Sequence, residues 1–156
     1  MTTREAVEPI AVPVARVSGN DDLPIPQPAT VESAGIDLRA AVREPRNLRP
    51  GERALIPTGV RIALPAGWEG QIRPRSGLAV RHGLTLLNSP GTIDADYRGE
   101  ISIVAVNLGQ EPVTIRRGDR IAQLVISPVA RAMLVETDEL PATERGEGGF
   151  GHTGVS

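Results

Sequence analysis

Glycine and proline recur every few residues between Pro9 and Gly118, and this spacing restricts the fold more than any other feature of the sequence. The chain has 17 glycines and 14 prolines among its 156 residues. Both residues are poorly tolerated inside helices, so no amphipathic helix of useful length fits between them. The intervals are rich in Val, Ile and Leu, which favour β-strands.

Several of these intervals are predicted as strands. They span residues 11–17, 35–41, 54–59, 60–65, 83–88, 100–108, 113–117, 120–126 and 132–137. Many short strands separated by turn signals predict an all-β fold, a jelly roll or distorted β-barrel. One short helix is expected over residues 76–83, with Ser76 as its N-cap and Gly83 as its stop.

The composition changes at Asp138, where the sequence becomes polar and rich in glycine. We therefore expect residues 1–137 to form one β-rich domain and residues 138–156 to form a mobile C-terminal arm. Only three aromatic side chains are present, Trp68, Tyr97 and Phe150, so the core must be aliphatic.

Composition and charge exclude several classes of function. The net charge is -2, so nothing indicates a general affinity for nucleic acid. The absence of cysteine excludes disulfides and thiolate metal sites. No apolar run reaches the ~18 residues of a membrane span, and the N-terminus lacks a signal-peptide core, so we expect a cytoplasmic protein. All 17 basic residues are arginine, so an anion must be bound by guanidinium or backbone N–H groups.

The stretch IRPRSGLA, residues 72–79, is a candidate anion site. It places Arg73 and Arg75 immediately before the predicted helix start. Free N–H groups at a helix start bind phosphate, Gly77 allows close approach, and Arg75 can add a charge-assisted hydrogen bond. A capped surface turn with solvated arginines would give the same sequence.

The stretch NSPGTIDADYRGE, residues 88–100, is denser in polar groups and precedes a strongly β-prone run. Apolar Ile93 beside Asp94 suggests a carboxylate at the edge of a pocket, where it could act as general base for a water molecule. The alternatives are a turn capped by the acids, a core tyrosine at position 97, and a metal bound by Asp94 and Asp96.

Two further polar residues interrupt apolar strands. Asp37 lies within AGIDLRA, residues 34–40, and a buried carboxylate is costly unless it is paired or lies near a metal. Asp37 is therefore either salt-bridged or part of a site. Gln123 interrupts RIAQLVI, residues 120–126, where an ordinary core or edge role is the simpler interpretation.

Taken in order, five stretches resemble the signature motifs of the homotrimeric dUTP pyrophosphatases (dUTPases). They are AGIDLRA, RPRSGLA, NSPGTIDADYRGE, RGDRIAQLVI and RGEGGFGHTG, and the match spans roughly residues 31–154. The resemblance implies a jelly-roll subunit, a homotrimer with sites at subunit contacts, and Mg²⁺-assisted hydrolysis of dUTP to dUMP and pyrophosphate. Such an enzyme keeps uracil out of DNA and supplies dUMP for thymidylate synthesis.

The resemblance also implies a role for each matching residue. Asp94 would activate the water that attacks the α-phosphorus, and Tyr97 would pack under the deoxyribose, where a 2'-hydroxyl would clash. Asp37 would reach Mg²⁺ through a coordinated water. The uracil pocket would be lined by Asn88, Thr92, Ile93 and Ser102. The triphosphate would be held by Arg75, Ser76, Gly77 and Gln123.

In the family the C-terminal arm closes over the bound nucleotide, which gives Phe150 a role in stacking on uracil. Base stacking contributes about 1–3 kcal/mol, whereas ordering each residue costs about 1–2 kcal/mol. Arg145 and the arm's backbone, Gly151 included, must therefore grip phosphates as well. His152 stands where the family more often has serine, and no role is assigned to the segment before Thr30.

Three rival functions are compatible with parts of this sequence. A dCTP deaminase shares the expected fold and much of the second motif, but its catalytic glutamate would fall at Val104. A trimeric nucleotide-binding or regulatory protein without turnover would lack Asp94, Arg145 or Phe150, all of which are present. A phosphatase with a metal on Asp94 and Asp96 would need more ligands, and neither histidine has suitable spacing.

Overall fold

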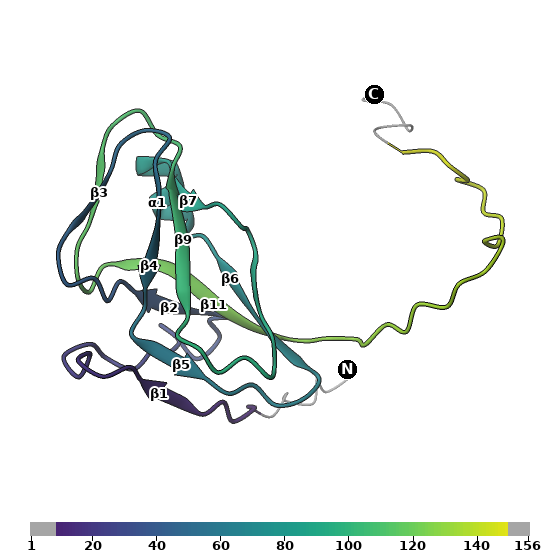
Figure 1. Ribbon diagram of the computed structural model, residues 1–156, viewed down its shortest axis with the longest axis horizontal. Helices are drawn as coiled ribbons and strands as arrows, with labels where there is room; N and C mark the ends of the chain where they lie inside the picture. Colours follow the sequence, from purple (N-terminus) through teal and green to yellow (C-terminus); the bar gives the residue numbers. More distant parts are fainter. Residues whose placement is uncertain (1–8, 150–156) are drawn as a thin grey trace, which may run out of the picture.

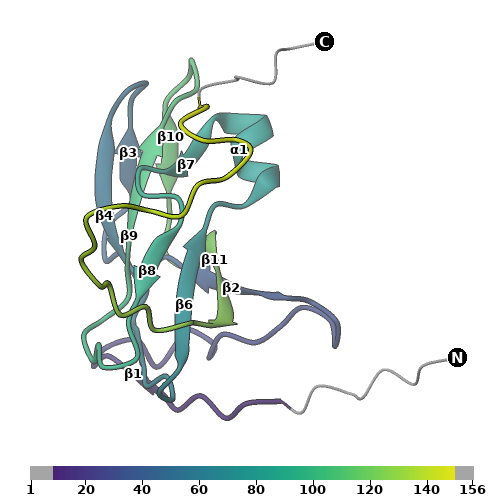
Figure 2. The ribbon, with the colours of Figure 1, turned by 90° about the vertical axis from the view of Figure 1, so that its right-hand side faces the viewer.

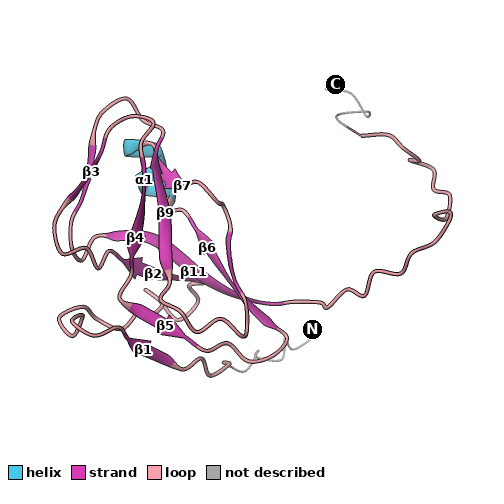
Figure 3. Ribbon diagram, viewed as in Figure 1, coloured by secondary structure: helices cyan, strands magenta, loops and turns pink. Residues whose placement is uncertain are grey.

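The computed structural model describes residues 9–149, which form eleven strands and one short helix (Figures 1 and 3). In chain order these are β1 (Val14–Arg16), β2 (Gly35–Arg39), β3 (Arg46–Leu48), β4 (Arg53–Pro57), β5 (Val60–Ile62), β6 (Trp68–Arg73), α1 (Ser76–His82), β7 (Leu84–Leu86), β8 (Gly91–Ile93), β9 (Ser102–Asn107), β10 (Val113–Ile115) and β11 (Arg120–Pro128). The all-β prediction is confirmed, although these sheets do not close into a barrel.

The strands form four antiparallel sheets. The largest has the order β2-β11-β6-β8, and the second has the order β4-β9-β7; β1 pairs with β5 and β10 pairs with β3. In the largest sheet Gln123 of β11 lies opposite Asp37 of β2 and Arg73 of β6. Because successive side chains alternate between faces, these three polar residues share one face, while their neighbours Leu38 and Leu124 point into the core.

The buried core is aliphatic, as the shortage of aromatic residues predicts. Its largest fully buried side chains are Leu38, Ile56, Ile101, Ile103 and Ile115, and Asn107 is buried among them. These aliphatic residues come from several sheets and from the loop before β9, and they belong to one core cluster. This shared core holds the polar edges of the strands in fixed positions.

The short helix α1 lies at the opposite end of the molecule from β1 (Figure 2). Gly83 stops it in the left-handed conformation, with φ 66°, as predicted. The predicted cap at Ser76 is wrong, because the N-cap is Arg75. Arg75 has extended backbone, and its carbonyl oxygen already accepts from the N–H groups of Leu78 and Ala79.

One predicted strand does not form. Residues 132–137 lie in an extended segment that leaves the body of the protein after β11 (Figure 1). Met133, Leu134 and Val135 are 74–95% exposed there. A strand needs a neighbour for its N–H and C=O groups, and within residues 9–149 this segment pairs with none. Strands β3, β6 and β8 were not predicted, because each is short or mixes polar with apolar residues.

Candidate active site

Five of the predicted site residues line one cavity of about 410 Å³, which we call the arginine cavity. Its lining comprises Asp37, Arg75, Ser76, Gly77, Leu78, Arg81, His82, Arg120 and Gln123. The sheet register explains this convergence: β11 places Gln123 beside Asp37, and β6 runs through Pro74 into α1. Three stretches far apart in the sequence therefore contribute to one site.

Asp37 is held between two guanidinium groups. Its Oδ1 lies 3.0 Å from Nε of Arg75, and its Oδ2 lies 3.1 Å from Nη1 of Arg120. The sequence allowed either an ion pair or a place in a site, and Asp37 has both. Arg75, Arg81 and Arg120 outnumber this single carboxylate, so the cavity suits a polyanion.

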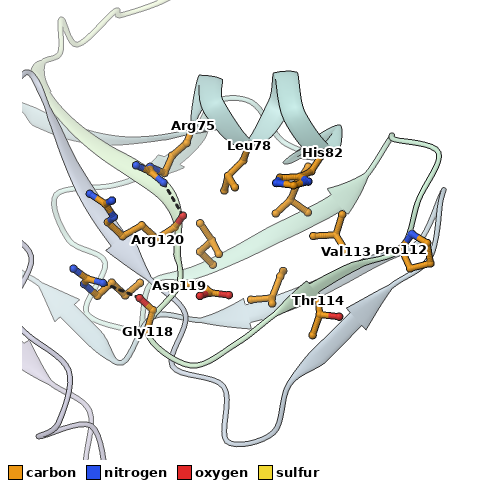
Figure 4. A pocket seen from close by; sticks show the side chains of 13 residues that line it. Arg75, Leu78, His82, Pro112, Val113, Thr114, Gly118, Asp119 and Arg120 are labelled. Atoms are coloured by element: carbon orange, nitrogen blue, oxygen red, sulfur yellow. Dashed lines mark hydrogen bonds between the residues drawn. The ribbon is translucent and has the colours of Figure 1, made fainter.

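The side chain of Arg75 has a further contact. Arg75 Nη1 donates to the carbonyl oxygen of Arg120, at 3.0 Å (dashed line, Figure 4). Figure 4 shows both residues at one edge of an adjoining cavity of about 530 Å³, in which α1 faces Val113 and Thr114 of β10. Side chains held in this way lose less freedom when they bind a ligand.

The start of α1 offers backbone donors to the same cavity. The N-cap residue provides no side-chain hydrogen bond to the first turn. The first N–H groups of a helix have no partner within the helix, so those of Ser76 and Gly77 can donate to a ligand.

Gln123 depends on a glycine that was not singled out from the sequence. Its Nε2 donates to the carbonyl oxygen of Pro74, at 3.0 Å, and its carboxamide lies over Gly35. A Cβ on Gly35 would overlap the Gln123 carboxamide oxygen. The feature of the sequence that could have identified Gly35 is its position, two residues before Asp37 on β2.

Six other predicted site residues line a second cavity of about 380 Å³, which we call the tyrosine cavity. They are Asn88, Thr92, Ile93, Asp94, Tyr97 and Ser102; the rest of the lining is Leu55, Ile72, Leu86, Gly91, Glu100, Ile103 and Val104. The lining is thus an apolar floor with a few polar groups, as in most small-molecule sites.

The loop between β8 and β9 arranges the polar groups of the tyrosine cavity. The N–H of Tyr97 donates to the carbonyl oxygen of Asp94, at 3.1 Å, and its hydroxyl donates to the carbonyl oxygen of Glu100, at 3.0 Å. The Glu100 carboxylate accepts from the N–H of Gly59, at 2.7 Å. This last bond ties the loop to the turn between β4 and β5.

Sequence reasoning missed Arg120 and Glu100 as contributors to these cavities. Arg120 stands three residues before Gln123, and only the pairing of β11 with β2 brings it to Asp37. Glu100 is the last residue of the quoted stretch NSPGTIDADYRGE, but its contact with Gly59 joins residues 41 positions apart. Neither contact leaves a local sequence signal.

The two cavities have no lining residue in common. Arg145, a third expected contributor, lies exposed on the segment after β11, and its Nε donates to the carbonyl oxygen of Gly148 at 2.7 Å. Phe150, Gly151 and His152 lie outside the described residues. The predicted site residues of a single chain are therefore distributed over separate places.

Two ion pairs away from both cavities shift the pKa of their carboxyl groups. A hydrogen bond from Arg117 lowers the pKa of Asp22, and one from Arg49 lowers the pKa of Glu52. Among the described residues no group of three or more His, Cys, Asp or Glu is arranged to hold a metal. Nor does the described part of the chain contain a helix long and apolar enough to cross a membrane.

Comparison with known proteins gives the same family throughout. The dUTPase family model matches residues 21–154. A deoxyuridine 5'-triphosphate nucleotidohydrolase of Methylocella silvestris is 53% identical over 151 residues, which cover 96% of this chain and 94% of the relative. One of Caulobacter vibrioides is 55% identical over 148 residues, covering 94% and 96%.

Solved structures agree with the sequence matches. A dUTPase of Staphylococcus bacteriophage 80alpha with dUpNHpp has a TM-score of 0.83 at 30% identity, covering 93% of this chain and 99% of that chain. A mutant dUTPase of phage phi11, described with a structural Mg(II) ion, has a TM-score of 0.75 at 27% identity, covering 83% and 98%.

Proposed function

The chain belongs to the dUTPase family and is a dUTP diphosphatase, and from this premise we propose how its residues bind and hydrolyse dUTP. One observation carries the proposal. Eleven of the predicted site residues gather in two cavities, one cationic and one with an apolar floor and the Asp94 carboxylate. A nucleoside triphosphate has the same two parts, an anionic chain and a flat base on a sugar.

The tyrosine cavity binds deoxyuridine in this proposal. Asn88 and the backbone groups of Thr92, Ile93 and Ser102 recognise the uracil edge, and the aliphatic floor contacts its faces. Tyr97 lies under the deoxyribose. Ribose, which carries a 2'-hydroxyl, is excluded because the Tyr97 ring occupies the space that the 2'-oxygen would need.

Asp94 orients and activates the attacking water in the same cavity. The proton passes from water to the Asp94 carboxylate as the oxygen attacks the α-phosphorus, and pyrophosphate leaves. General-base help of this kind contributes roughly 10²- to 10⁴-fold.

The arginine cavity holds the triphosphate. Arg75 contributes its charge, Ser76 and Gly77 contribute backbone N–H groups, and Gln123 contributes its amide. Arg145 and the glycine-rich segment with Phe150 and Gly151 complete the enclosure when they close over the nucleotide. Stacking by Phe150 alone is too weak to order this segment, so its contacts with phosphate are required.

Magnesium fits this arrangement through the substrate. Mg²⁺ tends to keep several waters and to take its other ligands from phosphates, and it neutralises charge that develops on them. No cage of protein ligands is present among residues 9–149, and both oxygens of Asp37 already face guanidinium groups. Asp37 would therefore hold a water of the hydrated ion, without a direct bond to the metal.

A trimer would join the parts that one chain keeps separate. The two cavities have no residue in common, and Arg145 lies on a segment that extends away from the body (Figure 1). If one subunit supplies the arginine cavity, a second the tyrosine cavity and a third the arm, each site is complete. The product, dUMP, would then feed thymidylate synthesis.

The test is to incubate the protein with Mg²⁺ and each deoxynucleoside triphosphate in turn, and to measure pyrophosphate and ammonia. Pyrophosphate from dUTP alone, abolished by EDTA, is the expected result. Ammonia from dCTP would indicate a deaminase. Bound dUTP without turnover would indicate a regulatory protein. Analytical ultracentrifugation of the same sample tests the trimer.

A further inference from the structure

The ring of Tyr97 lies directly over the backbone of Gly99. If Gly99 carried a Cβ, that atom would be 2.5 Å from Cζ of Tyr97 and 3.0 Å from Cε2, and closer still to the hydroxyl oxygen. The three nearest atoms all belong to Tyr97. The space that an alanine methyl would need is therefore filled by this one side chain.

The backbone at Gly99 does not itself require glycine. Seven glycines of the described chain have a positive φ, and Gly99 is not one of them. An alanine at Gly99 would meet no left-handed strain. What glycine provides at this position is room, and the room is used by the tyrosine.

Hydrogen bonds keep the ring in that place. The Tyr97 hydroxyl donates to the carbonyl oxygen of Glu100, the residue after Gly99. Glu100 is anchored to Gly59 through its carboxylate. Tyr97 is 44% exposed, so a displaced ring has solvent to move into and the buried core need not change.

We propose that Gly99 is a specificity-determining residue: by leaving its Cβ position empty it sets the Tyr97 ring at the depth that admits deoxyribose and excludes ribose. This inference rests on the proposed role of Tyr97 under the sugar. Gly99 does not touch the nucleotide; it acts through the ring, as a positioning residue.

Substitution of Gly99 by alanine moves the ring while the fold is kept. The flexible end of the tyrosine yields to the new methyl group and moves toward solvent. The 2'-oxygen of a ribonucleotide then meets less obstruction. A pocket that excludes a hydroxyl by shape discriminates by about 10²-fold, so a partly displaced ring loses roughly tenfold of this preference.

The experiment is a double-mutant cycle on the preference for dUTP over UTP, measured as the ratio of kcat/KM values. The four proteins are the unmodified chain, Gly99→Ala, Tyr97→Ala and the double variant. Gly99→Ala should lower the ratio about tenfold when Tyr97 is present. It should leave the ratio unchanged when Tyr97 is already alanine, since the methyl then has nothing to displace.

A second measurement follows the ring without reference to activity. Tyr97 is the only tyrosine, so incorporation of 3-fluorotyrosine gives a single ¹⁹F signal in the full-length protein. Gly99→Ala should shift this signal in the absence of nucleotide. An unshifted signal would mean that the ring has not moved, and the inference would be wrong.

Other outcomes would also overturn the inference, and they show whether the proposed role of Tyr97 or that of Gly99 is wrong. If Tyr97→Ala lowers the ratio but Gly99→Ala does not, the proposed role of Tyr97 stands and that of Gly99 fails. If Tyr97→Ala leaves the ratio unchanged, the proposed role of Tyr97 is wrong, and the inference about Gly99 is then wrong as well. An equal effect of Gly99→Ala in both backgrounds would show that it does not act through the ring.

Folding of the single variant is checked by thermal unfolding. If Gly99→Ala does not fold, the double variant decides. Its Tm should equal that of Tyr97→Ala if the ring is the only obstacle to the methyl. A Tm far below that value would mean that the new methyl group clashes with the backbone, and this would refute the inference.

Discussion

Asn107 gives the sharpest prediction of stability, because it is a polar side chain with no exposed surface. Its Nδ2 donates to the carbonyl oxygens of Leu48, at 2.9 Å, and Glu111, at 2.8 Å. Its Oδ1 accepts from the N–H of Gly109, at 2.8 Å. One side chain thus satisfies three backbone groups from β3 and the loop after β9.

The loop after β9 also contacts the C-terminal end of α1. The N–H of Leu108 donates to the carbonyl oxygen of Gly83, at 2.9 Å. A Cβ on Gly109 would overlap the carbonyl oxygen of His82, so the helix end and the loop are in close backbone contact. Asn107 therefore supports the helix that lines the arginine cavity.

Asn107→Ala leaves all three backbone groups without their partner. An unsatisfied buried polar group costs about 1–3 kcal/mol. Two of these three bonds are only partly buried, so water can compensate in part. A loss of about 4 kcal/mol follows, which is a large share of an ordinary stability of about 5–15 kcal/mol.

Urea unfolding, followed through the fluorescence of the single tryptophan, measures this loss. With a slope of about 2 kcal/mol per molar urea, the midpoint should fall by about 2 M at a fixed protein concentration. Asn47→Ala, at an exposed position of β3, is the matched control and should change stability by less than about 0.5 kcal/mol. A loss below about 1 kcal/mol for Asn107→Ala would refute the reasoning.

Three further predictions concern the active site and acid stability. Asp94→Ala should reduce turnover by roughly 10²- to 10⁴-fold while dUTP binding, measured by calorimetry, is largely kept; a proportional loss of both would count against a general base. Gly35→Ala should raise KM for dUTP by about tenfold, because its methyl displaces the Gln123 amide, and an unchanged KM would show that the amide does not hold phosphate. Arg117 lowers the pKa of Asp22, so the stability from this pair is present above the ordinary value of 3.8 and lost as the pH falls through the lower folded value. Asp22→Asn should therefore weaken the dependence of Tm on pH in this acid range, and an unaltered dependence would contradict the pairing.

Most strands could be predicted from the sequence because their signals are local. Glycine and proline limit helix length wherever they occur, and runs of β-branched residues between them have few alternatives. Residues 132–137 show the limit of this reasoning. Their composition favours a strand, but a strand forms only beside a partner, and no local signal says whether one is present. The predicted cap at Ser76 was wrong because the extended residue before the helix is Arg75, and the residue types at the helix start do not show which of the two is extended.

The sequence by itself determined the kind of fold, the order of the motifs and the residue types available for chemistry. It did so because turn residues and strand propensities act over a few positions, and because five motifs in order identify a family. The tertiary structure decided which of these residues meet. The pairing of β11 with β2 and β6 placed Arg120 against Asp37. The side chains of Gln123 and Tyr97 lie so close to Gly35 and Gly99 that neither glycine has room for a Cβ. Such contacts join positions by geometry in space, and no spacing along the chain encodes them.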